Sequence, residues 1–141
     1  MSKTLRPFHL AFPIHDINQT IDWYKNILGC TIGRQDTRWV DFNFFGHQIS
    51  GHLIDKNIKQ IKTNLVDGEN IPCRHFGIIL DLNNWEKLSK NLTSKKVEFV
   101  IKPYIRFKDT KGEQATFFIK DPNGNVLEFK SFKNDGMIFD N

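Results

Sequence analysis

Three histidines and one glutamate have the residue types of a transition-metal site. His9, His52 and His75 offer imidazole nitrogens, and Glu128 offers a carboxylate oxygen. Imidazole and carboxylate together are suitable ligands for Fe(II), Mn(II), Ni(II) and Zn(II). The four residues are far apart in the chain, so the hypothesis of a metal centre requires a fold that brings them together.

Glu128 belongs to a predicted β-hairpin. Residues 113–120 are rich in β-branched and aromatic side chains, residues 121–124 read Asp-Pro-Asn-Gly, which is typical of a turn, and residues 125–132 form the predicted returning strand. An unpaired, buried carboxylate in such a strand would be destabilising, and a bound cation would offset that cost. Glu128 is therefore the residue that most needs a partner.

The hairpin completes the second of two similar units. The order strand–helix–strand–strand–strand occurs twice, over about 70 residues each time. In the first unit we predict strands over 7–14, 30–35, 38–45 and 47–54, with a helix between the first two. In the second unit we predict strands over 73–82 and 97–101, a helix between them, a loop over 102–111, and then the hairpin.

Both predicted helices carry an apolar stripe. Asp16 is the predicted N-cap of the first helix and Gly29 follows its last turn. Asn83 or Asn84 is the predicted N-cap of the second. The stripes, spaced at helical intervals, are formed by Ile17, Ile21, Tyr24 and Leu28 in the first helix and by Trp85, Leu88 and Leu92 in the second.

The repeat places the four candidate ligands in corresponding positions. His9 and His75 begin the first strand of each unit, whereas His52 and Glu128 lie midway along the last strand of each. Two units related by a pseudo-twofold axis would bring all four onto one concave surface. Gly51 could introduce a bulge beside His52, so His47 or Gln48 are alternative ligands at that position.

These elements predict a single α+β domain over residues 1–141. Module one spans about 6–55, a polar, lysine-rich linker spans about 56–72, module two spans about 73–132, and a tail spans 133–141. We expect the two βαβββ modules to form a curved mixed β-sheet around the metal site, with the helices outside.

Composition excludes several classes of function. The net charge of +4 comes from scattered lysines without a basic–aromatic motif, so we predict no nucleic-acid partner. No run of about 18 apolar residues and no signal peptide is present, so we predict no membrane association. Cys30 and Cys73 lack metal or redox spacing, and we expect both to be small apolar fillers in a cytoplasmic protein.

The sequence resembles a known superfamily over about residues 6–132. The order of elements and the segments FHLAFPI, HFGIIL and DPNGNVLEF are similar to those of vicinal oxygen chelate proteins, which include glyoxalase I, extradiol dioxygenases, fosfomycin-resistance transferases and bleomycin-binding proteins. The segments WVDFNFFGHQISGHL and HFGIILDLNNW look like a bacterial subgroup labelled as dioxygenases or glyoxalase-like proteins.

The resemblance implies a ligand set. His9, His75 and Glu128 match the family's two-histidine, one-carboxylate triad, and His52 matches a fourth ligand position found in the glyoxalase branch. That branch generally has a glutamate at the position of His52. Extradiol enzymes usually have a tyrosine at the position of Phe118. The ligand set favours an Fe(II) oxygenase, with Mn(II), Ni(II) and Zn(II) as alternatives.

The resemblance also implies the function. We expect an extradiol-type dioxygenase acting on a bidentate, oxygen-bearing small molecule; the alternatives are a glyoxalase- or epimerase-like lyase or isomerase, and a non-catalytic binding or resistance protein. From their positions, Arg106 and Lys108 are candidates for binding an anionic substrate, and Tyr104 and Glu113 are candidate proton donors or acceptors. Paired chains often share two sites in short family members, so we expect a homodimer, either swapped or unswapped.

Overall fold

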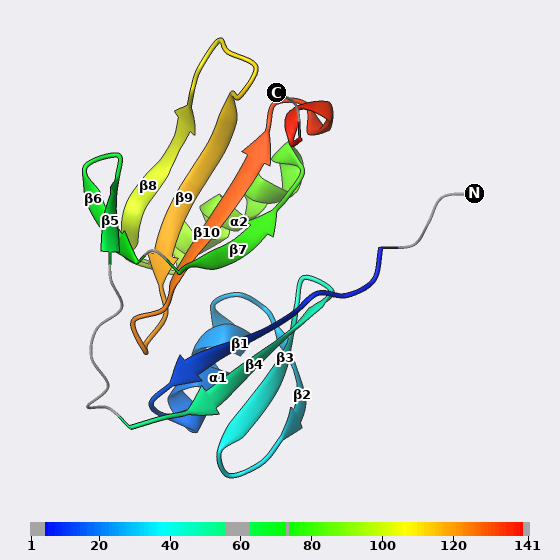
Figure 1. The fold of residues 1–141 in the computed structure, drawn as a ribbon, viewed down its shortest axis with the longest axis vertical. Coiled ribbons are helices and arrows are strands. Elements are labelled where there is room, and N and C mark those ends of the chain that lie inside the picture. The colour runs from blue at the N-terminus through cyan, green and yellow to red at the C-terminus, as the bar shows by residue number, and fades with distance from the viewer. Residues whose placement is uncertain (1–4, 56–62, 73, 140–141) are drawn as a thin grey trace. The chain divides into compact units, whose positions relative to one another are not determined.

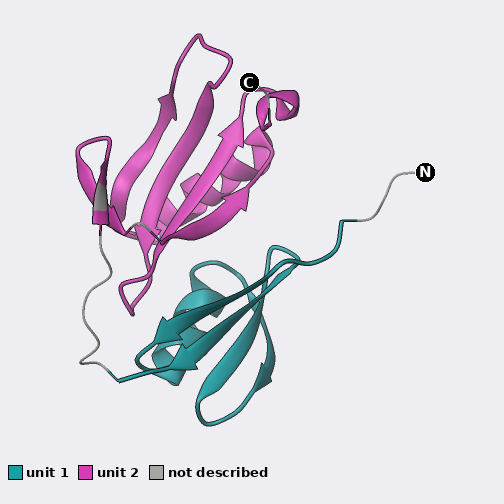
Figure 2. Ribbon diagram, viewed as in Figure 1, with its two compact units in different colours: residues 1–59 teal, residues 60–141 magenta. Residues whose placement is uncertain are grey.

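The computed structural model describes residues 5–55, 63–72 and 74–139. It divides into two compact units, residues 1–59 and residues 60–141, which are described separately below (Figure 2). Cys73 lies outside the described residues.

Unit 1 is a four-stranded mixed sheet with one helix (Figure 1). The strand order is β1-β4-β3-β2, with β1 parallel to β4 and the other pairs antiparallel. Its elements are β1 (His9–Ile14), α1 (Ile17–Asn26), β2 (Thr31–Gln35), β3 (Trp39–Phe44) and β4 (His47–Leu53).

Unit 2 repeats this topology. The order is β7-β10-β9-β8, again with one parallel pair, β7 with β10, and two antiparallel pairs. The predicted α+β class with two βαβββ modules is therefore confirmed. The repeated elements are β7 (Phe76–Ile79), α2 (Leu82–Ser94), β8 (Phe99–Arg106), β9 (Gln114–Lys120) and β10 (Val126–Phe132), and a short 3-10 helix, η1 (Asp135–Met137), follows.

The helix boundaries follow mostly from the predicted caps. The Asp16 side chain accepts a hydrogen bond from the Gln19 amide at 2.8 Å, as expected of an N-cap. The second helix begins earlier than predicted, because Asp81, and not Asn83 or Asn84, is its cap and accepts from the Asn84 amide at 2.9 Å. Among the described residues, no helix has the length and hydropathy needed to cross a bilayer.

Each helix covers one face of its own sheet. In unit 1, Tyr24 of α1 is fully buried and its ring lies 4.9 Å from that of Phe42 on β3. Burial raises the pKa of the Cys30 thiol to about 12, which agrees with its predicted role as an apolar filler. In unit 2, the Trp85 indole of α2 donates to the Phe129 carbonyl at 2.9 Å.

The opposite face of each sheet, which we call the open face, carries the polar residues. Side chains alternate along a strand, so residues on either side of Phe129 in β10 point away from α2. The open face comprises His9, Ala11, Pro13, Gln48, Ser50 and His52 in unit 1, and Tyr104, Thr116, Phe118, Val126, Glu128 and Lys130 in unit 2.

The predicted linker over 56–72 is partly wrong. Residues 63–72 form a second hairpin, made by β5 (Thr63–Val66) and β6 (Glu69–Pro72). Asp67 and Gly68 join the strands with φ angles of 49° and 84°, and two residues with positive φ make the turn type that matches the twist of paired strands. The Asp-Gly dipeptide was the sequence signal for this hairpin; residues 56–62 lie outside the described part.

The β5–β6 hairpin covers part of the open face of unit 2. Ile71 of β6 is fully buried in an apolar cluster with Ile101, Phe118 and Val126. The cluster explains why apolar residues occur on this face of β9 and β10. The polar part of the open face around Glu128 lies beside this apolar cluster.

β8 is longer than predicted. We expected a strand over 97–101 and a loop over 102–111, but pairing with β9 continues to Arg106, which lies opposite Gln114. Pro103 lies where the register between Ile101 and Tyr104 shifts. A proline is tolerated there because β8 is an edge strand with no further neighbour in this sheet.

Gly77 allows β7 to approach β10 closely beside Glu128. The two residues are paired in the parallel ladder. A Cβ atom added to Gly77 would lie 1.5 Å from the Glu128 carbonyl oxygen. Because backbone atoms of a central strand cannot move aside, only glycine fits at this position.

We predict that Gly77→Ala lowers the free energy of unfolding by more than about 2 kcal/mol, because the new methyl group must push the two strands apart. Chemical denaturation monitored by circular dichroism measures this change. Gly112→Ala is the matched control: its added Cβ would meet nothing closer than a Phe107 ring carbon at 3.8 Å. Equal stability of the two variants would contradict the prediction.

Candidate metal centre

His75 and Glu128 form the central pair of the candidate site. His75 immediately precedes β7, and Glu128 lies in the neighbouring strand β10. The His75 Nε2 and Glu128 Oε1 atoms are 3.5 Å apart, and the two side chains are 27% and 10% exposed. The pair is therefore largely shielded from solvent while one side remains accessible.

The β5–β6 hairpin orients the His75 ring. The His75 Nδ1 atom lies 3.0 Å from the carbonyl oxygen of Pro72, the last residue of β6. A carbonyl can only accept, so Nδ1 carries the hydrogen and donates it. In the neutral imidazole, Nε2 then has a free lone pair directed at Glu128.

The two oxygens of Glu128 have different roles. Oε2 accepts a hydrogen bond from the Thr116 hydroxyl at 2.7 Å. Oε1 faces His75 Nε2 at 3.5 Å and Lys130 Nζ at 4.0 Å. Thr116 therefore fixes the carboxylate and leaves Oε1 as the atom directed towards the histidine.

The electrostatic environment favours the charged form of both partners. The hydrogen bond to Glu128 is the main cause that raises the pKa of His75 above its ordinary value of 6.5. Burial alone would raise the pKa of Glu128, but hydrogen bonds from His75 and Thr116 and the charge of Lys130 lower it overall. The pair thus stabilises a positive charge between Nε2 and Oε1.

That positive charge can be a proton or a metal ion. If His75 is neutral with its hydrogen on Nδ1, the Nε2 lone pair faces a lone pair of Glu128 Oε1 across 3.5 Å. A cation between the atoms would relieve this repulsion, and imidazole plus carboxylate is a donor set for divalent transition metals. The chemistry of these two donors therefore fits a metal ion.

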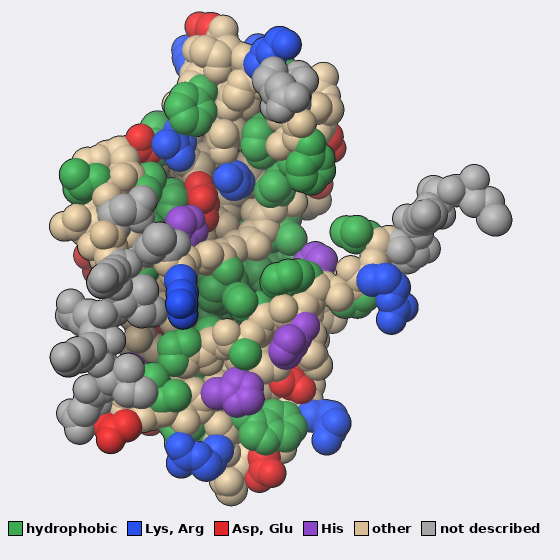
Figure 3. Space-filling model, viewed as in Figure 1, with side chains coloured by type: hydrophobic (Ala, Val, Ile, Leu, Met, Phe, Trp, Pro, Cys, Tyr) green, Lys and Arg blue, Asp and Glu red, His purple; other side chains and the backbone are tan. Residues whose placement is uncertain are grey.

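A hollow in unit 2 gives access to the pair. It has a volume of about 230 Å³, and it is lined by the residues of β7 and by three polar residues, His75, Glu128 and Lys130. In Figure 3, a histidine, acidic side chains and basic side chains lie next to one another over the open face of unit 2. The lining residues are His75, Phe76, Gly77, Ile78, Ile79, Glu128 and Lys130.

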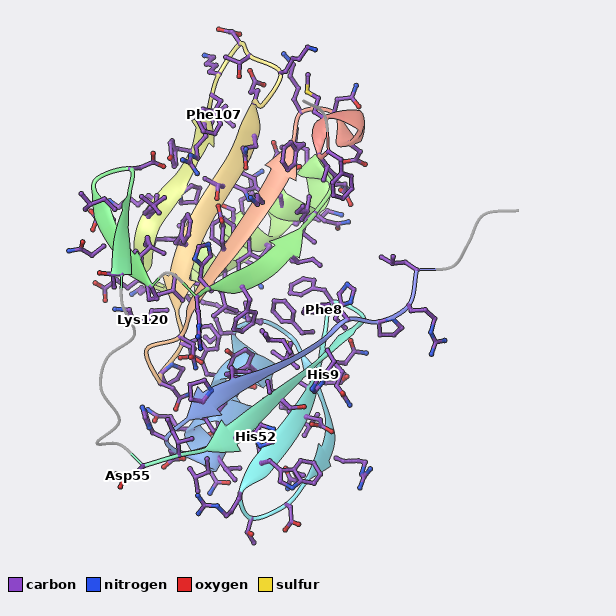
Figure 4. The ribbon with its side chains drawn as sticks, viewed as in Figure 1. Phe8, His9, His52, Asp55, Phe107 and Lys120 are labelled. Carbon is purple, nitrogen blue, oxygen red and sulfur yellow. The ribbon has the colours of Figure 1, made fainter. Side chains whose placement is uncertain are left out.

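The open face of unit 1 carries the other two candidate ligands, His9 and His52 (Figure 4). His9 is exposed, and its Nδ1 atom lies 2.9 Å from Gln48 Oε1. Asp41 accepts from Gln48 Nε2 at 3.5 Å and from the Ser50 hydroxyl at 2.5 Å. His9 is thus at one end of a polar network that the sequence analysis did not identify.

His9 and His52 do not converge within unit 1. His9 is paired with Gln48, whereas His52 is four residues further along β4, opposite Pro13. Four residues of a strand span roughly 13 Å, so the two histidines lie well apart along the open face. The ladder runs without a shift through Gly51, so the bulge considered there does not occur.

The expected correspondence between His52 and Glu128 is wrong. Glu128 is paired with Gly77, two residues after His75. Ser50 is paired with Ala11, two residues after His9, so Ser50 is the counterpart of Glu128. His52 corresponds to Lys130, and its role as a metal ligand stays a prediction.

His47, the alternative to His52, lies on the other face of the sheet. It is paired with the buried Phe44, which shares a face of β3 with Phe42, the residue that contacts Tyr24 of α1. Its Nδ1 atom accepts a hydrogen bond from the Phe8 amide at 2.8 Å. This position separates His47 from the open face that carries His9.

Tyr104 and Arg106 are held by the turn of the β5–β6 hairpin. The Tyr104 hydroxyl donates to the Asp67 carboxylate, and Arg106 Nε lies 3.2 Å from Asp67 Oδ2. Tyr104 is paired with Thr116, and Thr116 is paired with Lys130. Tyr104 therefore lies on the open face, level with Lys130 and two residues further along the sheet than Glu128. Both side chains have a structural role in addition to the catalytic role predicted for them.

Glu113 is not brought to the His75–Glu128 pair. One of its carboxylate oxygens accepts from the Asp109 amide at 2.8 Å, and the other lies 3.8 Å from Lys133 Nζ. It precedes Phe118, the cross-strand partner of Glu128, by five residues, which is roughly 17 Å along a strand. Glu113 therefore closes the β8–β9 loop in this structure.

Sequence reasoning missed Thr116, Lys130 and Pro72 as parts of the site. The first two were accessible in principle: a hairpin closed at 121–124 pairs Thr116 with Lys130, on the same face as Glu128. The role of Pro72 has no local sequence signal, because it depends on how the β5–β6 hairpin packs against the sheet.

Comparison with known proteins identifies the family. The model of the glyoxalase/bleomycin resistance protein/dioxygenase superfamily matches residues 6–129. A protein of that description from Alicyclobacillus acidocaldarius is 31% identical, with a TM-score of 0.83 over 99% of this chain and 100% of its own. No curated protein sequence matches significantly.

More distant structures share the fold. The fosfomycin resistance protein FosX from Listeria monocytogenes is 14% identical, with a TM-score of 0.67 over 97% of this chain and 98% of its own. A variant of FosX, aligned over 100% of both chains, was solved with Mn(II) and 1S,2S-dihydroxypropylphosphonic acid. By its family match and its Alicyclobacillus relative, the chain belongs to the glyoxalase/bleomycin resistance protein/dioxygenase superfamily.

Proposed function

We propose that the protein is a metal-dependent enzyme in which His75, Glu128 and His9 hold a divalent transition metal ion. The observation that carries this proposal is that His75 Nε2 faces Glu128 Oε1 across 3.5 Å, while His75 Nδ1 and Glu128 Oε2 are each held by another partner. Family membership supports it, and so does the Mn(II) complex of FosX. Fe(II) remains our favoured metal, with Mn(II), Ni(II) and Zn(II) as alternatives.

His9 is the proposed third ligand. Within the described residues, no three His, Cys, Asp or Glu side chains form a ready group, so the pair needs a ligand from elsewhere. Because the Gln48 amide donates to Asp41, its oxygen faces His9 and accepts from Nδ1. That leaves His9 Nε2 available, in the same tautomer as His75.

A homodimer is the proposed assembly, because His9 can then come from the same chain or from a partner chain. The swapped and the unswapped dimer are both proposed as alternatives. The predicted cytoplasmic location and the assignment to the subgroup labelled as dioxygenases also stay predictions.

The proposed substrate is a small molecule with two neighbouring oxygen atoms. When bound, the metal supplies Lewis-acid polarisation of a substrate oxygen and, if it is Fe(II), a centre for oxygen chemistry. His75 and Glu128 would hold the ion, Thr116 holds the carboxylate, and β7 would line the space for the substrate.

We propose extradiol-type dioxygenation as the reaction, on the basis of the two-histidine, one-carboxylate set. Phe118, which replaces the tyrosine expected in that class, is 1% exposed and lies in the apolar cluster under the β5–β6 hairpin. This observation favours a second candidate, a glyoxalase- or epimerase-like lyase or isomerase, which does not need that tyrosine.

Oxygen uptake separates the two candidates. The Fe(II)-loaded protein is assayed with a panel of catechols in an oxygen electrode, and the Ni(II)- and Zn(II)-loaded proteins with 2-oxo-aldehyde thiol adducts. Catechol-dependent oxygen uptake supports the dioxygenase. Turnover of the adducts alone supports the lyase, and tight binding without turnover in either assay supports a binding protein.

We predict that His75→Gln and Glu128→Gln each weaken Mn(II) or Co(II) binding by about a hundredfold or more, because each removes a ligand atom. Isothermal titration of protein purified without a histidine tag measures the affinity. His9→Gln is expected to have a similar effect. The matched control is His47→Gln, which changes a histidine on the helix-covered face and should leave the affinity unchanged.

His52→Gln is the discriminating variant in this series. Unchanged metal affinity would restrict the ligand set to three residues, as the strand register suggests, whereas a large loss would restore His52. Full metal occupancy in His75→Gln, or a wild-type protein that takes up no transition metal, would refute the metal centre.

We predict a stability window for the metal-free protein. The lowered pKa of Glu128 stabilises the fold above its ordinary value of 4.5, and this contribution disappears as the pH falls through the folded pKa. The raised pKa of His75 stabilises the fold below its ordinary value of 6.5, and this contribution disappears as the pH rises through the folded pKa.

Both contributions to stability are therefore fully present between the two ordinary pKa values, 4.5 and 6.5. In denaturation experiments with chelator-treated protein, Glu128→Gln should cost about 1 kcal/mol near pH 5 to 6 and less on either side. A cost that does not change between acid and alkaline pH would show that the ion pair contributes nothing to folding.

A further inference from the structure

We propose that Lys130 selects anionic substrates for the metal centre and couples their binding to that of the metal. This inference deepens the proposed function and rests on it. The substrate class is a small, negatively charged molecule with two neighbouring oxygens, such as a 2-oxo or 2-hydroxy carboxylate or an enediolate. Lys130 acts here as a specificity-determining residue.

Lys130 occupies a fixed position beside the proposed ligands. It lies two residues after Glu128 on the same face of β10, opposite Thr116. Its Nζ atom is 4.0 Å from Glu128 Oε1, the same oxygen that faces His75, and its side chain is 33% exposed. It also lines the hollow that gives access to the pair.

The charge of Lys130 is less well balanced with a divalent metal beside Glu128 than without one. In the metal-free protein, the ammonium group pairs with the Glu128 carboxylate. An ion held by Oε1 at about 2 Å would be no more than about 6 Å from Nζ. The ion and the ammonium group would then repel each other in a partly desolvated site.

A negatively charged ligand removes this repulsion, because it can bind the metal and accept hydrogen bonds from Lys130 at once. The anion and the metal therefore stabilise each other's binding, and the coupling is reciprocal. A neutral ligand gains no such contribution.

Arg106 does not provide the same function. Its guanidinium is paired with Asp67 at 3.2 Å, whereas Lys130 is the one lysine or arginine among the described residues that line the hollow. At about 230 Å³, the hollow is also smaller than a typical drug-sized pocket of about 300–1,000 Å³. Size and charge together favour a small anion.

Lys130→Met tests the inference, because it should change two affinities in opposite directions. Removing the ammonium group should tighten the binding of Mn(II) alone by about threefold to tenfold, and should weaken oxalate binding to the Mn(II)-loaded protein by about tenfold or more. Isothermal titration measures both. Lys130→Arg should restore oxalate binding.

Two controls separate charge selection from a general effect. Lys87→Met removes the same charge from α2, which covers the other face of the sheet, and should change neither affinity. Imidazole, a neutral metal ligand, should bind the Lys130→Met protein at least as tightly as the wild type.

The outcomes distinguish this inference from the proposed function. If wild-type protein binds no Mn(II), the metal centre itself fails. If it binds Mn(II) but Lys130→Met weakens both affinities, or changes neither, the metal centre stands and the role assigned to Lys130 is refuted.

Discussion

The desolvated carboxylate of Glu128 is the constraint on which unit 2 depends. It lies in an inner strand of the sheet with an exposed fraction of 8%, where an uncompensated charge would be costly. Thr116, His75 and Lys130 each satisfy part of it. The glycine opposite, Gly77, allows the outer strand to come close enough for His75 to reach it.

The β5–β6 hairpin links this site to the rest of the unit. Its apolar side, through Ile71, covers the sheet beside Glu128, and its last residue, Pro72, sets the tautomer of His75. At its other end, Asp67 holds Tyr104 and Arg106. One short hairpin therefore both excludes water from the carboxylate and orients the imidazole that faces it.

The two units share a topology but differ in chemistry at equivalent positions. Where unit 2 has Glu128 between His75 and Lys130, unit 1 has Ser50, and the nearest carboxylate comes from Asp41 on the neighbouring strand. Their similar positions midway along the last predicted strand of each unit suggested that His52 was the counterpart of Glu128. The strand register instead makes Ser50 the counterpart, two residues before His52 on the same face. Sequence spacing cannot reveal this difference, because loops of different length precede the two strands.

The sequence by itself determined the order of elements, both apolar helix stripes and the hairpin that carries Glu128, since these depend on local periodicity, caps and turn residues. Only the tertiary structure decided which residue of β4 lies opposite each residue of β1, and which atom of His75 faces Glu128. The reason is physical: strand register and imidazole tautomer are fixed by contacts between residues distant in the chain, and such contacts leave no periodic signal in the sequence.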